Sequence, residues 1–429
     1  MSSIGDRLRG IVRSGGSRKQ DPPYEAREQD PSYGSEIGAS QLQPRPGPMD
    51  PATVLDGVWQ LSGSHRFLVV DRSYAPGHRH GSISIADSLP PEEGWSRLGL
   101  LAGTPCGGRL LFLDLETTGI AGGAGSYAFL VGCGWFERGR FHVRQFLLSS
   151  FASERVLLEA VREVAGDVDA VVTYNGKSFD LPLIETRYSL NRLTTPFADM
   201  PHVDMLHHAR RLWHGDDEGH RLTSLETSLL GHERDGDVPG FEIPARYFRY
   251  VHTGDARPLA AVLEHNRLDL VSLALLTARA AQLLDEGVTG AATAREALGM
   301  GRLYERSGMT SDALACFARA GDMGPGPVPE ALYAHAVLLR RLRRYELAAG
   351  AWQRLLELED CPPRLEREAA EALAVHHEHR LRSLPSARDL AMRSLLLGKT
   401  HTRREAIEHR LARLDRKLAR VEPALPALF

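Results

Sequence analysis

Five ionisable residues have the types and spacings of a hydrolytic site. Asp114 and Glu116 stand two positions apart at the end of the apolar run RLLFLDLETTG. Because side chains alternate along a strand, both carboxylates should project from one face. Uncompensated, they would repel and raise each other's pKa, and a divalent cation relieves that repulsion. Oxygen-only ligation favours Mg²⁺ or Mn²⁺. The alternative is a helix N-cap with a solvated acid beside it.

Three further residues complete the set. Asp180 follows the strand-like segment DAVVTYNG and opens a helical one, FDLPLIETRYSL. His265 and Asp269 are four positions apart in EHNRLD, which places them on one helix face. Two ions about 3.5–4 Å apart stabilise the attacking and leaving oxygens when a phosphodiester is hydrolysed. The sequence therefore predicts a two-metal site with His265 as general base.

The elements around these residues predict an α/β fold. RFLVVDRSY and HGSISIADSL look like strands. RLLFLDLETTG, SYAFLVGCGWF and RFHVRQFLL follow as three consecutive strands, the last two joined by a hairpin at Glu137-Arg138-Gly139. Helices and strands then alternate, starting with a helix that Ser153 could cap and ending with a long helix from about 258 to 284. This order predicts a mixed sheet, antiparallel at one side, with flanking helices.

The C-terminal third has only helical patterning. Small and aromatic residues recur at an offset of 35 positions, as in Gly301, Tyr304 and Phe317 and then Ala336, Leu339 and Trp352. A period near 34 residues is typical of tetratricopeptide-like helix pairs. A generic helical bundle is the alternative. We expect two or three repeats to pack on the α/β domain.

Composition gives domain limits and a class of protein. The chain has 429 residues and a formal net charge of −3. Residues 1–50 are rich in Ser, Gly and Pro and predict a disordered tail. We place the α/β domain at 51–288, with an N-terminal extension at 51–109, and the helical-repeat domain at 289–429.

The same inventory argues against membrane and secreted classes. No run of 18 apolar residues predicts a membrane span, and the N-terminus has no signal-peptide core. The four cysteines are far apart in the sequence, with no CxxC motif, which fits a reducing cytoplasm. We therefore expect a cytoplasmic protein with no membrane partner.

The motifs carry a family resemblance. LFLDLETTGIAGGAGSYAFLVG, VVTYNGKSFDLPLIETR and LEHNRLDLVSLALL resemble the DEDD group of 3′–5′ exonucleases in the ribonuclease H-like superfamily, and within it the YprB-type proteins. The resemblance covers roughly residues 50–285. It implies metal binding by four carboxylates and a general base at His265. The metal-binding residues would be Asp114, Glu116, Asp180 and Asp269.

The resemblance also implies substrate contacts. Asn175 and Phe179 match positions that usually touch the substrate strand, and Thr117 in the first motif is grouped with them. The sequence departs from the pattern at two places. A catalytic histidine in this group usually stands five residues before the last aspartate, whereas His265 stands four before Asp269, and Tyr174 occupies a position that is often histidine.

Two other residues are weighed from their own chemistry. Lys177, one of only four lysines, lies inside the second motif and could contact a phosphate; a solvated loop lysine is the alternative. Asp204 is a further candidate for a place near the carboxylates. Residues 297–429 hold 22 Lys and Arg against 17 Asp and Glu, so a basic face could guide a nucleic acid, although solvated helix faces give the same count.

These observations predict a metal-dependent nuclease. We expect a 3′–5′ exonuclease that hydrolyses DNA or RNA phosphodiesters with two Mg²⁺ or Mn²⁺ ions and takes a single-stranded 3′ end. The polarity is implied by the resemblance alone. The alternative is a nucleic-acid-binding or scaffold protein with a slow or inactive core, whose helical repeats bind a protein partner.

Overall fold

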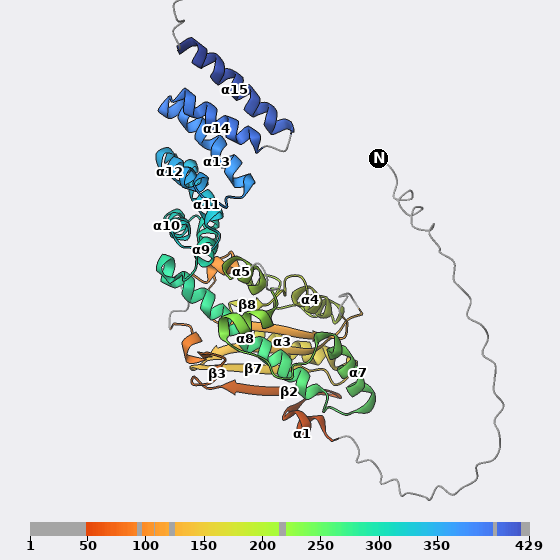
Figure 1. Cartoon of the computed structure of the whole chain (residues 1–429). Helices are drawn as coiled ribbons and strands as arrows, with labels where there is room; N and C mark the ends of the chain where they lie inside the picture. The colour runs from red at the N-terminus through yellow and green to blue at the C-terminus, as the bar shows by residue number, and fades with distance from the viewer. Residues whose placement is uncertain are drawn as a thin grey trace, which may run out of the picture. The chain divides into compact units, whose positions relative to one another are not determined.

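The computed structural model describes residues 49–91, 97–106, 108–119, 125–213, 220–397 and 401–421. The predicted tail at 1–50 lies outside these ranges except for its last two residues. An α/β region comes first and a helical region follows it (Figure 1). Within the described ranges, no helix combines the length and apolar character needed to cross a membrane.

The main sheet is mixed, as predicted. Its order is β1-β2-β7-β6-β5-β8-β9, antiparallel from β1 to β5 and parallel from β5 to β9. The strands are β1 (Val58–Ser62), β2 (His65–Tyr74), β5 (Leu110–Thr117), β6 (Ala128–Glu137), β7 (Arg140–Leu147), β8 (Ala170–Thr173) and β9 (His202–Asp204). The predicted strand in HGSISIADSL is reduced to β4 (Ile83–Ser84), which pairs with β3 (Arg79–His80).

The hairpin between β6 and β7 forms where the sequence predicts it. Arg138 and Gly139 both have positive φ, 50° and 72°. Two consecutive residues of this kind match the twist of the flanking strands, and glycine at the second adopts the conformation without strain.

One predicted helix cap is confirmed in position but not in its hydrogen bond. Ser153 stands just before α3 (Glu154–Ala165), but its side chain makes no capping hydrogen bond. The Ser153 hydroxyl instead accepts the Arg66 N–H and lies 3.2 Å from the Ser150 hydroxyl. The long-range contact to β2 replaces the local one, which sequence spacing alone cannot indicate.

Helices cover both faces of the sheet. On one face, Phe112 of β5 packs with residues of α8 (Leu259–Glu286) and α5 (Met205–Leu212). On the other, Leu111 and Leu113 pack with α3, α4 (Asp180–Leu190) and α7 (Ile243–Thr253). The alternation along β5 therefore turns its even-numbered positions, which include Asp114 and Glu116, toward α8. Figure 1 shows α8 crossing the sheet.

Shorter elements connect these layers. They are α1 (Pro51–Leu55), α2 (Gly99–Ala102) and α6 (Leu222–Leu225), with single turns at η2 (Ala86–Ser88), η3 (Phe151–Ser153), η4 (Glu226–Leu230), η5 (Gly240–Glu242), η6 (Gly287–Gly290) and η7 (His377–Leu381). Near the start of the first described range, the Asp50 carboxylate accepts the indole N–H of Trp59 at 2.9 Å and the N–H of Ala52.

The C-terminal region consists of helices packed on their neighbours in sequence. They are α9 (Ala294–Arg306), α10 (Thr310–Asp322), α11 (Val328–Arg341), α12 (Tyr345–Leu356), α13 (Pro363–His376), α14 (Leu384–Leu396) and α15 (His401–Val421). The helical character confirms the sequence pattern, while the tetratricopeptide-like assignment stays a prediction. Residues of α9 to α11 share one hydrophobic cluster with the sheet and α8, so the two regions are packed together.

Candidate active site

Asp114 and Glu116 lie at the C-terminal end of β5, in the middle of the sheet. They alternate with the buried residues Leu113 and Leu115, which belong to the opposite face. The register to β6 shifts between Glu116 and Thr117. Because side chains alternate along the strand, both acids point toward α8. Strand β5 itself is paired with β6 on one side and β8 on the other.

Asn266 of α8 fixes Asp114. Its amide nitrogen donates to the Asp114 carboxylate at 2.7 Å and to the Asp114 carbonyl at 3.2 Å. The Asn266 oxygen accepts a hydrogen bond from Gln145 of β7, which also donates to the Leu263 carbonyl. Asn266 and Gln145 are both fully buried. A Cβ on Gly132 would lie 2.3 Å from the Asn266 oxygen, so the strand needs glycine there.

Asp180 joins the same site from the loop that follows β8. It is the first residue of α4, and its carboxylate accepts a backbone hydrogen bond from Leu115, which lies between Asp114 and Glu116. The structure thus brings together acids that stand more than sixty residues apart in the sequence.

Asp204 holds the β8–α4 loop in place. Its two carboxylate oxygens accept the N–H groups of Asn175 at 2.8 Å and Lys177 at 3.0 Å. Asn175 has a φ of 65°, which asparagine tolerates better than most residues. Gly176 then passes so close to Thr173 that a Cβ would be 2.4 Å from its hydroxyl oxygen. The weaker candidate of the sequence analysis, Asp204, is thus a buried anchor of this loop.

The predicted substrate-contacting residues lie around the carboxylates. Thr117 ends β5 and its hydroxyl donates to the Gly119 carbonyl at 3.0 Å. Asn175, Lys177 and Phe179 belong to the loop that leads to Asp180. Phe179 is 57% exposed, an unusual position for a large apolar side chain. The structure places these residues on the same strand and loop as Glu116 and Asp180. Their contact with substrate remains a prediction.

The acids raise one another's pKa. Burial raises the pKa of Asp114 well above its usual range, and the charges of Asp269 and Glu116 raise it further. Burial and the charge of Asp269 do the same for Glu116. Burial raises the pKa of Asp180 to about 7. The pKa of Asp269 is also raised by burial, against the lowering effect of Arg234.

A network that the sequence analysis missed surrounds His265. Its Nδ1 lies 2.7 Å from an Asp237 oxygen, and its Nε2 lies 3.8 Å from an Asp269 oxygen. The Arg234 guanidinium contacts Asp237 at 3.0 Å and pairs with both Asp269 and the buried Glu226. Arg234 and Asp237 stand in an irregular segment after η4, where no periodicity points to them.

The chemistry of this site suits a hard divalent cation. Four carboxylates with raised pKa values, of which Glu116 is buried and the other three are half-buried, are the donor set that Mg²⁺ or Mn²⁺ prefers. Within the described ranges, however, no group of three or more His, Cys, Asp or Glu side chains is gathered tightly enough to hold a metal ion. The contact of Asp269 with Arg234 gives one physical reason, because that carboxylate is directed to a guanidinium.

Known proteins place the chain in a family. Residues 111–281 match the RNase H superfamily model. The uncharacterized protein YprB of Bacillus subtilis (strain 168) is 30% identical over 376 residues, which cover 84% of this chain and 90% of YprB.

A solved structure is also similar: the family B DNA polymerase of the archaeon Pyrobaculum calidifontis, at 15% identity and a TM-score of 0.33. That match covers 57% of this chain and 34% of the polymerase, and at this score it carries no argument about function. The fold of residues 111–281 and the extended identity to YprB lead to one conclusion: the chain belongs to the YprB family and carries a nuclease fold of the RNase H superfamily.

Proposed function

We propose that the protein is a metal-dependent nuclease that shortens nucleic acid from its 3′ end. The observation that carries the proposal is the meeting of Asp114, Glu116 and Asp180 with Asp269 of α8, where burial and the charge of Asp269 raise the pKa values of the other three acids. A family with an RNase H fold supports the reaction class; the 3′ polarity rests on the motif resemblance.

The carboxylates would hold two Mg²⁺ or Mn²⁺ ions, which supply charge stabilisation for the scissile phosphate and the departing oxygen. Asn266 keeps Asp114 in one orientation through the hydrogen bond to its carboxylate. Such supporting hydrogen bonds typically change metal affinity by about 10–100-fold.

His265 is the general base in this proposal. Asp237 accepts the Nδ1–H of His265, which fixes the tautomer that leaves the Nε2 lone pair free. Nε2 lies on the side of Asp269, so it can accept a proton from water at the carboxylates. The four-residue step to Asp269 is therefore compatible with a base that a third residue orients.

The test is degradation of single-stranded RNA and DNA labelled at the 3′ or the 5′ end. The full-length protein is incubated with Mg²⁺, Mn²⁺ or EDTA, beside Asp114→Asn and the matched control Asp199→Asn, which changes an exposed aspartate. We expect metal-dependent shortening from the 3′ end that Asp114→Asn abolishes and Asp199→Asn retains. Full activity of Asp114→Asn would refute the site.

One observation favours a second candidate, a nucleic-acid-binding protein with a slow core. Arg234 already neutralises Asp269, which would weaken the fourth ligand. In that case the protein would bind a single strand equally well with Mn²⁺ and with EDTA, and no labelled end would shorten. The helical region would then be the part that recruits a protein partner.

A further inference from the structure

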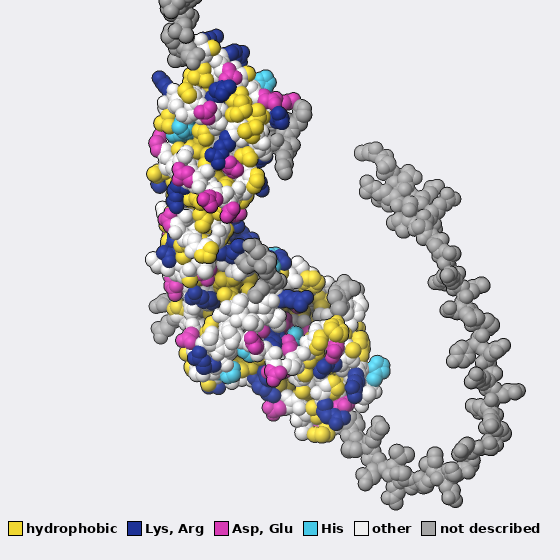
Figure 2. All heavy atoms as spheres, viewed as in Figure 1, with side chains coloured by type: hydrophobic (Ala, Val, Ile, Leu, Met, Phe, Trp, Pro, Cys, Tyr) yellow, Lys and Arg dark blue, Asp and Glu magenta, His cyan; other side chains and the backbone are white. Residues whose placement is uncertain are grey.

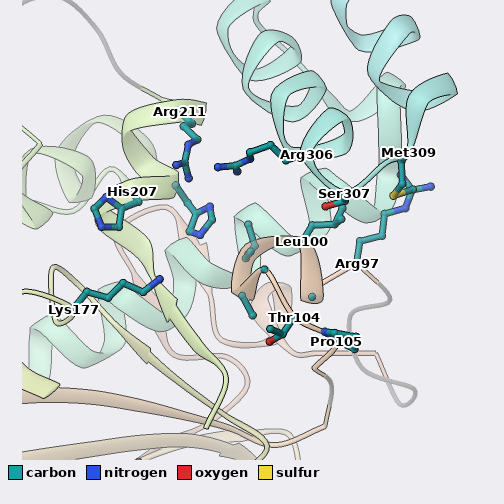
Figure 3. Close-up of a pocket in the computed structure, with 15 residues that line it drawn as sticks. Arg97, Leu100, Thr104, Pro105, Lys177, His207, Arg211, Arg306, Ser307 and Met309 are labelled. Atoms are coloured by element: carbon teal, nitrogen blue, oxygen red, sulfur yellow. The ribbon is translucent and has the colours of Figure 1, made fainter. Parts of the chain in front are cut away.

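A second candidate site lies beside the β8–α4 loop, where α2, α5 and α9 meet. It is a cavity of about 770 Å³, which we call the junction cavity. Its lysine and arginine residues are Arg97, Lys177, Arg211 and Arg306 (Figure 3). Leu100, Pro105 and Met309 form part of its wall. Its volume is within the range of small-molecule and cofactor sites.

Of the arginines that line the junction cavity, Arg97 has a carboxylate partner, Asp312 at 4.0 Å. None of the described residues that line the cavity is Asp or Glu. Arg211 and Arg306 make no ion pair within the described ranges, and in Figure 3 their side chains extend toward one another. Burial and then the charges of Arg306 and Arg302 lower the pKa of Arg211, which is the sign of crowded positive charge.

The walls of the cavity are held firmly. Gly299 of α9 packs against the Arg211 carbonyl, where a Cβ would be 2.5 Å away. The Trp213 indole N–H donates to Glu296 of α9 at 3.1 Å. Because α5 and α9 are fixed to each other in this way, Arg211 and Arg306 are kept close despite their repulsion. An anion between them would relieve it, and guanidinium groups match phosphate geometry.

A buried histidine adds a polar group to this wall. His208 is 5% exposed and lines the cavity, and its Nδ1 has no hydrogen-bond partner in the described part of the chain. Leu100, Pro105 and Met309 supply apolar surface next to these groups. Apolar surface beside arginines suits a nucleotide unit, in which a base adjoins a phosphate.

One loop connects the wall of the junction cavity to the candidate active site. Lys177 lines the cavity, and Asp180 stands three residues further on. Asp204 holds the Lys177 N–H and precedes α5, which carries His208 and Arg211. Figure 2 shows further Lys and Arg side chains at the border between the helical and α/β regions.

We propose that the junction cavity binds backbone phosphates of the single-stranded nucleic acid whose end lies at the carboxylates. The proposal rests on the proposed nuclease function and adds where the strand continues: between α5 of the nuclease fold and α9 of the helical region. Arg211 and Arg306 contact phosphates, and Lys177 lies between them and the reacting end.

The test measures binding of a labelled single-stranded oligonucleotide of about 20 nucleotides. Fluorescence anisotropy gives Kd in EDTA at several salt concentrations. The full-length variant Arg211→Gln/Arg306→Gln is compared with Arg210→Gln/Arg295→Gln, which removes two arginines of the same helices that do not line the cavity. We expect Kd to rise at least about 10-fold and the slope of log K against log salt to fall by about 1.4 in the cavity variant only.

A conservative variant separates charge from folding. Arg211→Lys/Arg306→Lys should keep most of the salt slope while losing part of the affinity, because lysine retains the charge without the fork. Thermal unfolding of all variants checks that the fold is intact. Unchanged Kd and slope in the Gln variant would overturn the proposal, as would equal weakening in the control pair.

Two further measurements keep this proposal separate from the nuclease. In Mn²⁺, the cavity variant should raise KM for the long strand and leave cleavage of a dinucleotide, which offers one phosphate, unchanged. If the wild-type protein cleaves no substrate but the Arg211→Gln/Arg306→Gln variant still binds the oligonucleotide more weakly, the result would support the cavity proposal and reject the nuclease. Displacement of the oligonucleotide by inorganic phosphate or a mononucleotide at micromolar concentration would show a small-molecule site and reject the strand.

Discussion

Asp237 lies 2.7 Å from Nδ1 of His265, on the side of the ring opposite to the atom that faces Asp269. The two residues come from different parts of the chain, an irregular segment and the middle of α8. A carboxylate at Nδ1 selects the tautomer with a free Nε2 and stabilises the imidazolium that forms when Nε2 takes a proton. In the function we propose, this geometry prepares His265 to act as the general base.

The first prediction concerns this pair. His265→Ala should lower kcat by about 10²–10⁴-fold, as expected for loss of a general base. Asp237→Ala should lower kcat by at least about 10-fold, and it should have little further effect in a His265→Ala background, because residues that act as one unit are not additive. Steady-state kinetics of the two single variants and the double variant measure this. If the loss of kcat in the double variant equals the product of the two single losses, Asp237 acts independently of His265.

The second prediction concerns metal affinity. Asn266→Ala removes the donor to Asp114 and should weaken Mn²⁺ binding by about 10–100-fold. Gly132→Ala should have the same consequence, because the new methyl group would push Asn266 away. Isothermal titration with Mn²⁺ gives both affinities. Gly350→Ala is the control, since a Cβ there meets nothing within 4 Å. Wild-type affinity in both variants would disprove the positioning role.

A third prediction concerns stability without metal. Burial raises the pKa of Asp180 to about 7, so the folded protein keeps this proton at pH values where the unfolded chain has lost it. The stabilisation of the folded state by this bound proton is fully present below about pH 4 and is lost as the pH rises through 7. In EDTA, Asp180→Asn should therefore be more stable than wild type at pH 8, on the order of 2 kcal/mol, and lose less stability between pH 5 and pH 8.

Urea unfolding at several pH values measures the difference, with Asp199→Asn as the exposed control. Adding Mn²⁺ should stabilise the wild type more than Asp180→Asn, because only the wild type retains the full ligand set. A variant whose stability follows the wild-type curve at every pH would contradict the raised pKa.

A fourth prediction concerns Arg234, which pairs with the fully buried Glu226. Arg234→Met leaves that carboxylate uncompensated and should lower the free energy of unfolding by about 3–5 kcal/mol. Arg234→Met/Glu226→Leu should recover part of this loss, because the buried charge is gone. Urea unfolding distinguishes the cases. If the double variant is as unstable as the single one, the pairing with Glu226 is not what Arg234 contributes.

The mixed sheet and the proximity of the acids could be predicted because both are encoded in local sequence patterns. Asp114 and Glu116 interrupt an apolar strand, and His265 and Asp269 recur at a helical spacing, so local periodicity already encodes their faces. Neither Asp237 nor Arg234 has such a signal, because the segment after η4 has no repeat. Asn266 and Gln145 were also missed, since a polar residue in a buried position shows its partner only after folding.

Ser153 illustrates the same limit from the opposite side. Its type and position are those of a helix cap, yet the hydroxyl binds β2 and Ser150. The irregular segment and this serine both depend on contacts between distant parts of the chain. Local rules fail at such positions because the competing partner comes from another element.

The cluster shared by the sheet and α9 to α11 has a consequence for how the protein can be divided. Phe112 of β5, Leu276 of α8 and Phe317 of α10 belong to one buried set. A chain cut at residue 288, where the sequence suggests a boundary, would open that set to water. We expect the shortest fragment that folds independently to extend through α11. The first helices of the C-terminal region are therefore part of the hydrophobic core of the nuclease fold.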